Sequence, residues 1–163
     1  MSLPMNEHQI FQKIISGGQT GADQGALDAA LELGHPCGGW CPKGRRSEAG
    51  PISQRYPVTE HSSESYQTRT EANIIDSDGT LVFTCGEPAG GTKETIDLAR
   101  KHGKPYFLLD LEKGDPNSDL ETIREWGGKN QVTVLNVAGP RESKNPGISA
   151  RVRQSILHLL SPE

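Results

Sequence analysis

Short apolar runs alternate with segments of helical periodicity along most of the chain. Apolar runs of this kind, bounded by glycine, proline or polar residues, are typical of buried strands. They predict strands over residues 13–16, 35–41, 80–84, 105–111 and 132–139. Apolar residues three or four positions apart predict helices over residues 23–34, 65–76, 92–103, 117–126 and 146–160.

Two of these helices carry a clear apolar stripe. In the helix over 146–160, apolar residues recur every four positions, at Ile148, Val152, Ile156 and Leu160. In the helix over 23–34, we expect the stripe to consist of Ala26, Leu27, Ala30, Leu31 and Leu33, and Gly34 to end the helix. Residues 42–60 contain glycines, prolines and four cations without a period, so we expect a loop there.

The alternation of strands and helices determines the expected fold class. Strands separated by helices form parallel sheets with helices on both faces. We therefore expect an α/β fold, a three-layer Rossmann-like domain with a parallel sheet of five or six strands. A single domain should span residues 13–163, and the polar residues 1–12 should form a flexible N-terminal lead-in.

Composition and charge narrow the classes of partner. The chain has 163 residues and a net charge of −4, and this absence of a basic excess argues against a nucleic-acid partner. No run approaches the roughly 18 apolar residues that a membrane-spanning helix needs, and the N-terminus lacks the apolar core of a signal peptide. We therefore expect a cytoplasmic protein with no membrane partner.

The cysteine count argues against both disulfides and a structural metal. Three cysteines, Cys37, Cys41 and Cys85, are too few for a disulfide framework. Cys37 and Cys41 stand four residues apart, but no second pair of cysteine or histidine residues completes a zinc site. We expect reduced thiols and no metal held directly by the protein.

Three notable loops each follow a predicted strand, at residues 16–23, 42–50 and 84–92. Ligands of parallel α/β sheets bind beyond the carboxyl ends of the strands. We therefore expect these three loops to meet at one rim of the sheet and to form a ligand site there.

The loop over 16–23, with the sequence SGGQTGAD, supplies most of the candidate residues. Glycines let the backbone approach a ligand closely, and the amides of a following helix favour an anion. Gln19 offers a donor and an acceptor, and Asp23 is either a helix cap or an acceptor for ring N–H groups. The alternative is a tight structural turn. The candidate binding residues are Gly17, Gly18, Gln19, Thr20, Gly21, Ala22 and Asp23.

The other two loops add a second amide-rich turn and a group of cations. The sequence AGGTKET repeats the glycine–threonine pattern of the first loop and contributes Gly90, Gly91, Thr92 and Thr95. The loop over 42–50 contributes Lys43, Arg45 and Arg46, which suit phosphate or another oxyanion. The alternative for this basic stretch is a solvated surface.

Two further candidates lie on the helix over 65–76 and at the end of the strand over 80–84. Arg69 and Asn73 lie one turn apart and face the same way. Asparagine is not favoured inside a helix, so Asn73 needs a contact with a ligand or a neighbouring subunit. Cys85 is either a small buried hydrophobic residue or a neighbour of a ligand that carries sulfur or metal.

The motifs together resemble one protein family. The segments SGGQTGADQGALDAAL, GGWCPKGRRSEAG, YQTRTEANIIDSDGTLVF and GGTKETIDLA are similar to the molybdenum cofactor carrier proteins, and the likeness covers roughly residues 13–160. This family is related to the Rossmann-like group of SLOG domains and LONELY GUY phosphoribohydrolases.

The resemblance implies a homo-oligomeric carrier, a dimer or a tetramer. It would bind and protect the molybdenum cofactor, molybdopterin with its molybdenum, and deliver it to molybdenum enzymes or insertion machinery. Molybdenum would be held through the cofactor, and phosphate, sulfate or molybdate ions would fit the same loops.

The related phosphoribohydrolases offer the alternative of a nucleoside-monophosphate hydrolase or a nucleotide-sensing domain. Their motif pairs an upstream arginine with P-G-G-x-G-T-x-x-E. Arg69 matches the arginine, but the glutamate position is Thr95, and Glu94 stands one residue early. One residue rotates a helical side chain by about 100°. We expect Glu94 to point away from the ligand and the protein to have no catalytic residues.

Overall fold

The computed structural model describes residues 9–113 and 116–161. Five parallel strands form the main sheet in the order β2-β1-β7-β5-β6, which confirms the predicted α/β class with a five-stranded sheet. The strands are β1 (Lys13–Ile15), β2 (Cys37–Gly38), β5 (Gly79–Thr84), β6 (Tyr106–Asp110) and β7 (Val134–Ala138).

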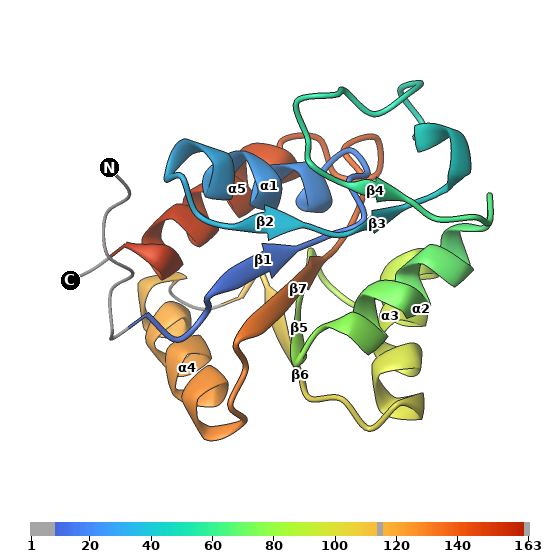
Figure 1. Cartoon of the computed structure of the whole chain (residues 1–163). Helices are drawn as coiled ribbons and strands as arrows, with labels where there is room; N and C mark the ends of the chain where they lie inside the picture. The colour runs from blue at the N-terminus through green and yellow to red at the C-terminus, as the bar shows by residue number, and fades with distance from the viewer. Residues whose placement is uncertain (1–8, 114–115, 162–163) are drawn as a thin grey trace.

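Helices cover both faces of this sheet, as the three-layer prediction requires (Figure 1). One layer contains α1, α4 and α5, and the other contains α2 and α3. The helices are α1 (Ala22–Glu32), α2 (Tyr66–Asp76), α3 (Gly90–Lys101), α4 (Pro116–Lys129) and α5 (Ile148–Leu160). Helix α3 begins two residues before its predicted start, which places Gly90 and Gly91 in its first turn.

The central strand β5 is buried along its whole length, and its side chains alternate between the two faces. Leu81 and Phe83 belong to the large core that α1 and α5 cover. On the other face, the Thr80 hydroxyl accepts a hydrogen bond of 3.2 Å from Asn136 Nδ2 on β7. The face of β5 with Leu81 and Phe83 therefore packs in the core, and polar side chains of β5 and β7 meet on the opposite face.

The strand order is that of a doubly wound sheet, but the first strand of this chain is not the first strand of the usual order. If β5, β6, β7, β1 and β2 are read as strands 1 to 5, the sheet order becomes 5-4-3-1-2. This is the flavodoxin-like order, in which a ligand binds between strands 1 and 3. Those strands are β5 and β7, followed by α3 on one face and by α5 on the other. The topology thus places a crevice at their carboxyl ends.

The predicted strand over 35–41 divides at Gly39, which has a φ of 127°. A Cβ atom there would lie 2.0 Å from the Ser16 carbonyl oxygen, so only glycine allows this approach. The chain then leaves the main sheet, and β3 (Trp40–Cys41) pairs in parallel with β4 (Thr59–Glu60). The expected loop over 42–60 therefore contains a short strand, together with one turn of 3-10 helix (Lys43–Arg45).

Packing begins before residue 13, where we expected the domain to start. Phe11 is completely buried in the main core, and Gln9 Nε2 donates a hydrogen bond of 2.8 Å to the Leu160 carbonyl oxygen. A Cβ atom on Gly127 would lie 2.6 Å from the Phe11 ring, so α4 contains glycine where this ring packs. Residues 9–12 are thus part of the domain, and residues 1–8 lie outside the described residues.

The predicted stripe of α1 is wrong at its end, because Leu31 and Leu33 are exposed. Small residues make the close contact between α1 and α5 instead: a Cβ atom on Gly25 would lie 2.4 Å from the Ser149 carbonyl oxygen. Ala26 and Ala29 continue this surface and are fully buried.

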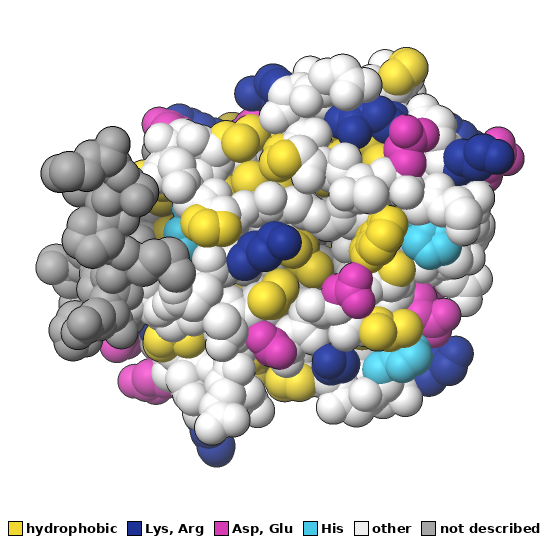
Figure 2. All heavy atoms as spheres, in the orientation of Figure 1, with side chains coloured by type: hydrophobic (Ala, Val, Ile, Leu, Met, Phe, Trp, Pro, Cys, Tyr) yellow, Lys and Arg dark blue, Asp and Glu magenta, His cyan; other side chains and the backbone are white. Residues whose placement is uncertain are grey.

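On the face shown in Figure 2, hydrophobic side chains are interspersed with acidic and basic ones.

Candidate ligand-binding site

A cavity of about 520 Å³ lies at the carboxyl ends of β5 and β7, where the topology predicts a crevice. Its walls come from the loop after β1 and the start of α1, from the ends of β5 and β7, from α2, and from the first two turns of α3. Protein cavities that bind small molecules typically have this size. The cavity is therefore the candidate functional site.

Two of the three predicted loops line this cavity. The predicted residues that line it are Gly17, Gln19, Asp23, Arg69, Asn73, Cys85, Gly90, Gly91, Thr92 and Thr95. The predicted residues that do not line it are Gly18, Thr20, Gly21, Ala22, Lys43, Arg45 and Arg46.

The basic loop over 42–50 does not border the cavity because its central arginine has a structural role. The Arg45 guanidinium donates hydrogen bonds of 2.7–3.1 Å to four carbonyl oxygens, those of Ile52, Ser53, Tyr56 and Val58. The Arg46 guanidinium lies 5.3 Å from the centre of the Tyr66 ring, and Tyr66 lines the cavity whereas Arg46 does not. The expectation that this loop joins the site is therefore wrong for Arg45.

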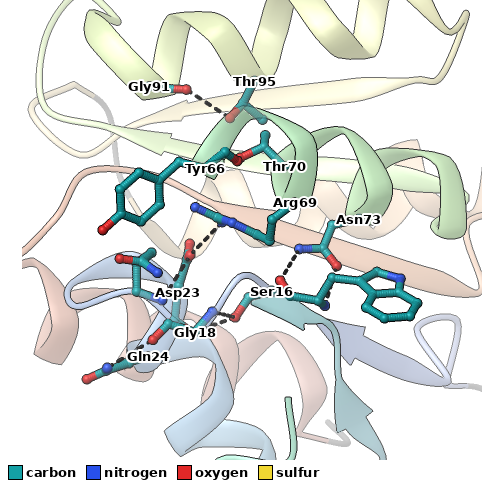
Figure 3. A network of polar contacts seen from close by, with 12 residues as sticks. Ser16, Gly18, Asp23, Gln24, Tyr66, Arg69, Thr70, Asn73, Gly91 and Thr95 are labelled. Carbon is teal, nitrogen blue, oxygen red and sulfur yellow. Dashed lines mark hydrogen bonds and ion pairs between the residues drawn. The ribbon is translucent and has the colours of Figure 1, made fainter. Parts of the chain in front are cut away.

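Gly17, Arg69 and Asp23 line the cavity, and Figure 3 shows the Arg69 and Asp23 side chains pointing toward each other. Arg69 is 8 % exposed, and its Nη1 lies 3.5 Å from Asp23 Oδ2. A Cβ atom on Gly17 would lie only 1.7 Å from Arg69 Nη1, so the guanidinium occupies the space that any side chain at position 17 would need. The glycine of the motif thus makes room for the arginine of α2.

Burial of this ion pair changes the acidity of both partners. Burial raises the pKa of Asp23 to about 6, although the Arg69 charge and hydrogen bonds from the Gln19 and Gly17 amides oppose the shift. The Gln19 amide lies 3.3 Å from Asp23 Oδ2. Burial also lowers the pKa of Arg69. Burial therefore disfavours the charged forms of both side chains, and shifted pKa values of this kind are typical of binding sites.

Two polar atoms at this side of the cavity have no partner among the described residues: Gln19 Oε1 and Arg69 Nε. The Gln19 side chain is oriented by its Nε2, which donates a hydrogen bond of 2.8 Å to the Arg46 carbonyl oxygen. A flipped amide would turn its oxygen toward that carbonyl oxygen, so Oε1 is the acceptor left without a partner. Buried polar atoms are almost always hydrogen-bonded, so this unpaired donor and acceptor, on two residues that line the cavity, are candidate contacts for a polar ligand or a water molecule.

Asn73 lines the cavity, but its amide already has two backbone partners. Oδ1 accepts from the Trp40 amide at 2.8 Å, and Nδ2 donates to the Trp40 carbonyl oxygen at 3.0 Å. In Figure 3 the Asn73 side chain points away from the Arg69–Asp23 pair. The asparagine inside the helix thus attaches α2 to β3, so a contact within the chain explains it.

The remainder of the 16–23 loop is closed by the segment that follows β7. The Ala22 amide donates to the Pro140 carbonyl oxygen at 3.0 Å. The Thr20 hydroxyl donates to Glu48 and accepts from the Glu142 amide at 3.3 Å. A Cβ atom on Gly21 would lie 2.3 Å from the Pro140 oxygen. Gly21 and Ala22 at the start of α1 are therefore covered by the protein itself and do not line the cavity, whereas Asp23 in the same turn does.

The N-terminus of α3 is open. Apart from adjacent residues and the backbone of the helix itself, no atom of the described chain lies within 4 Å of the position that a Cβ atom on Gly90 or Gly91 would take. Ala89 precedes the helix and makes no side-chain capping hydrogen bond. The Thr92 and Lys93 amides donate to the Ala89 carbonyl oxygen at 3.2 and 3.4 Å. The Gly90 and Gly91 amides are therefore the ones that can attract an anion at this helix end. This end of the cavity therefore offers hydrogen-bond donors.

The end of β7 and the segment after it also line the cavity, although no candidate site residue was predicted there. The cavity wall includes Asn136, the stretch 137–141, Lys144 and Asn145. Arg141 lies 4.8 Å from the centre of the Tyr66 ring, and both residues line the cavity. The signal was present, because the sequence VAGPRESKNPG also links a predicted strand to a predicted helix through glycine and proline.

Glu94 lines the cavity together with Arg69, so the expectation that it points away is wrong. It stands in the second turn of a helix whose N-terminal end faces the cavity, and there more than one face borders the open space. Thr95, the expected residue, also lines the cavity, and its hydroxyl donates to the Gly91 carbonyl oxygen at 2.9 Å.

Cys85 lies between this cavity and a smaller one of about 250 Å³, whose wall includes Lys144 and Arg151. Burial raises the pKa of the Cys85 thiol, and all three cysteines are free.

Within residues 9–113 and 116–161, no group of three His, Cys, Asp or Glu side chains is placed to hold a metal ion. Over the same residues, no helix is long and apolar enough to cross a membrane.

Comparisons with known proteins agree with this architecture. No curated protein matches the chain. A crystal structure from Syntrophus aciditrophicus, named "Putative molybdenum carrier protein", shares 39% sequence identity with it, and the match covers 94% of this chain and 97% of that chain. The TM-score is 0.90. The sequence also matches the Circularly permutated YpsA SLOG family over residues 14–160, in keeping with the displaced start of the sheet. The chain therefore belongs to this SLOG family, which confirms the predicted relationship.

Proposed function

We propose that the protein binds the molybdenum cofactor in the cavity between β5 and β7 and carries it without chemical change. The name of the solved relative supports a carrier role. The observation that carries the proposal is the unpaired Arg69 Nε and Gln19 Oε1 at one side of a cavity whose other side is an open helix N-terminus. A ligand with a polar ring and an anionic tail would contact the unpaired atoms with its ring and the helix N-terminus with its tail.

The residues present fit the cofactor. Its phosphate suits the amides of the first turn of α3, together with Thr92. Its pterin ring suits the buried polar atoms of Gln19 and Arg69. The molybdenum would be held by the sulfur atoms of the pterin. The proposal includes assembly of a homo-oligomer, a dimer or a tetramer, and delivery to molybdenum enzymes or their insertion machinery.

Cofactor recovered from cells tests this proposal directly. The protein is purified from a host that makes the molybdenum cofactor, oxidised, and analysed for the fluorescent pterin product and for molybdenum per subunit. We expect near-stoichiometric amounts of both. Purified protein that contains neither, and that binds no cofactor added in excess, would contradict the proposal.

Variants connect the recovered cofactor to the cavity. Arg69→Met removes the buried guanidinium, and Gly91→Val narrows the cavity at a position where a side chain meets no other atom. Both should lower the recovered pterin at least tenfold. Arg55→Met is the matched control, because the Arg55 side chain is mostly exposed and pairs with Asp28 outside the cavity. It should retain the full amount.

One observation favours a second function, hydrolysis of a nucleoside monophosphate or recognition of a nucleotide. Glu94 and Arg69 line the same cavity, as the arginine and glutamate of a phosphoribohydrolase would. Release of free base from adenosine monophosphate tests this alternative. Activity in the parent protein that is lost in Glu94→Gln would support it, and no activity in the parent protein would exclude it for that substrate.

A further inference from the structure

The cavity has two chemically different ends. The 16–23 loop contributes hydrogen-bond acceptors, the Asp23 carboxylate and Gln19 Oε1. The first turn of α3 contributes donors, the amides that follow Ala89. Acceptors and donors at opposite ends impose one orientation on a ligand whose own ends differ.

The acceptor end is rigid. The Gln19 side chain is 4 % exposed and is fixed by its hydrogen bond to the Arg46 carbonyl oxygen. The Asp23 carboxylate is fixed by the Gln19 amide and by Arg69. Arg69 adds one unpaired donor beside these acceptors. Fixed groups discriminate between ligands better than mobile ones, because a mismatched ligand leaves them unpaired.

We infer that Asp23 and Gln19 are specificity residues that recognise the 2-amino-4-oxopyrimidine edge of a bicyclic heterocycle, while the anionic tail of the ligand lies at the N-terminus of α3. This inference rests on the proposed function and names the part of the ligand that is read. The edge presents a ring N–H and an amino group side by side, and a carboxylate accepts from both. A ring with a 2-oxo group in place of the 2-amino group would direct an oxygen at Asp23.

Two commercially accessible compounds differ at the 2-position and, as a consequence, in whether N1 carries a hydrogen. Pterin-6-carboxylate has the 2-amino group, lumazine-6-carboxylate has a 2-oxo group, and both have an anionic tail. Titration calorimetry at pH 7.5 should show that the parent protein binds the pterin compound at least about tenfold more tightly. Asp23→Asn should abolish this preference. Gln19→Met should reduce it, and this second variant leaves the Asp23–Arg69 pair in place.

Asp28→Asn is the matched control, because Asp28 lies on the same helix and contacts Arg55 and Tyr56 outside the cavity. It should keep the preference of the parent protein. Equal affinity for the two compounds, or no binding of either, would overturn the inference. So would an Asp23→Asn variant that weakens both equally, because Asp23 would then only position Arg69. Each of these results leaves the cofactor-recovery experiment unaffected, so the two failures are distinguishable.

Discussion

The loops over 16–23 and 84–92 have similar sequences but opposite relations to the rest of the protein. Each follows a parallel strand, contains paired glycines and a threonine, and leads into a helix. The first loop is filled by the protein itself: Arg69 covers Gly17, and the Pro140 carbonyl oxygen covers Gly21. The second has no neighbouring atom within 4 Å of the Cβ position of Gly90 or Gly91.

This difference shows that a glycine motif has two distinct uses. In the first loop, the missing side chain makes room for another part of the chain, and the loop presents fixed side chains to the cavity. In the second loop, the missing side chains leave backbone amides accessible. The pattern of glycines alone does not distinguish these uses, whereas the atoms that a Cβ would meet do.

The largest expected effect comes from adding one methyl group to each loop. Gly17→Ala would displace Arg69 and leave Asp23 buried without its partner, because the new Cβ would lie 1.7 Å from Arg69 Nη1. Breaking a buried pair is strongly destabilising, so we expect a loss of about 3 kcal/mol in the free energy of unfolding. Urea denaturation measures this loss.

Gly91→Ala is the matched substitution in the open loop. It meets no atom and replaces a helical glycine, so the free energy of unfolding should stay the same or rise by up to about 1 kcal/mol. Recovery of bound cofactor should nevertheless fall, because Gly91 lines the cavity and the methyl group would hinder access to its amide. Equal losses of stability in the two variants would show that the loops do not differ in the way described.

A smaller effect should appear in the pH dependence of stability, with opposite signs for Asp23 in the first loop and for Asp110 beside the second loop. Burial raises the pKa of Asp23 from 3.8 to about 6, so the native protein holds this proton more tightly than the unfolded chain. Its contribution is therefore fully present below about pH 4 and is lost as the pH rises through about 6. The expected change is on the order of 2 kcal/mol, measured as the difference between the parent protein and Asp23→Asn.

Asp110 provides the contrast beside the second loop. Hydrogen bonds from the amides of Gly86 and Glu112 lower the pKa of Asp110. Its contribution is present above its unfolded value of 3.8 and is lost as the pH falls below it. Asp110→Asn should therefore remove a stabilisation that Asp23→Asn leaves intact. Two variants with the same pH profile would contradict the assigned environments.

The sequence predicts the sheet correctly, because short apolar runs follow from local chemistry. Residues of two of the three predicted loops line the candidate cavity, and their role in binding stays a prediction. Arg69 lines the cavity, as does Asn73 one turn later, in agreement with the shared helix face that their spacing predicts. The prediction from the sequence fails for Arg45, whose four carbonyl partners come from a loop without periodicity. It fails for Arg141 because the approach of the β7 loop to the cavity is a property of the tertiary fold.

The smallest expected effect separates two threonines that occupy similar places in the two motifs. Thr20→Val removes a hydroxyl that contacts Glu48 and the Glu142 amide, so it should lower the free energy of unfolding by about 1 kcal/mol. Because Thr20 does not line the cavity, recovery of bound cofactor should not change. Thr92→Val removes a hydroxyl from the cavity wall, so it should lower that recovery with little change in stability. The reverse pattern would mean that the first loop, and not the start of α3, holds the anionic part of the ligand.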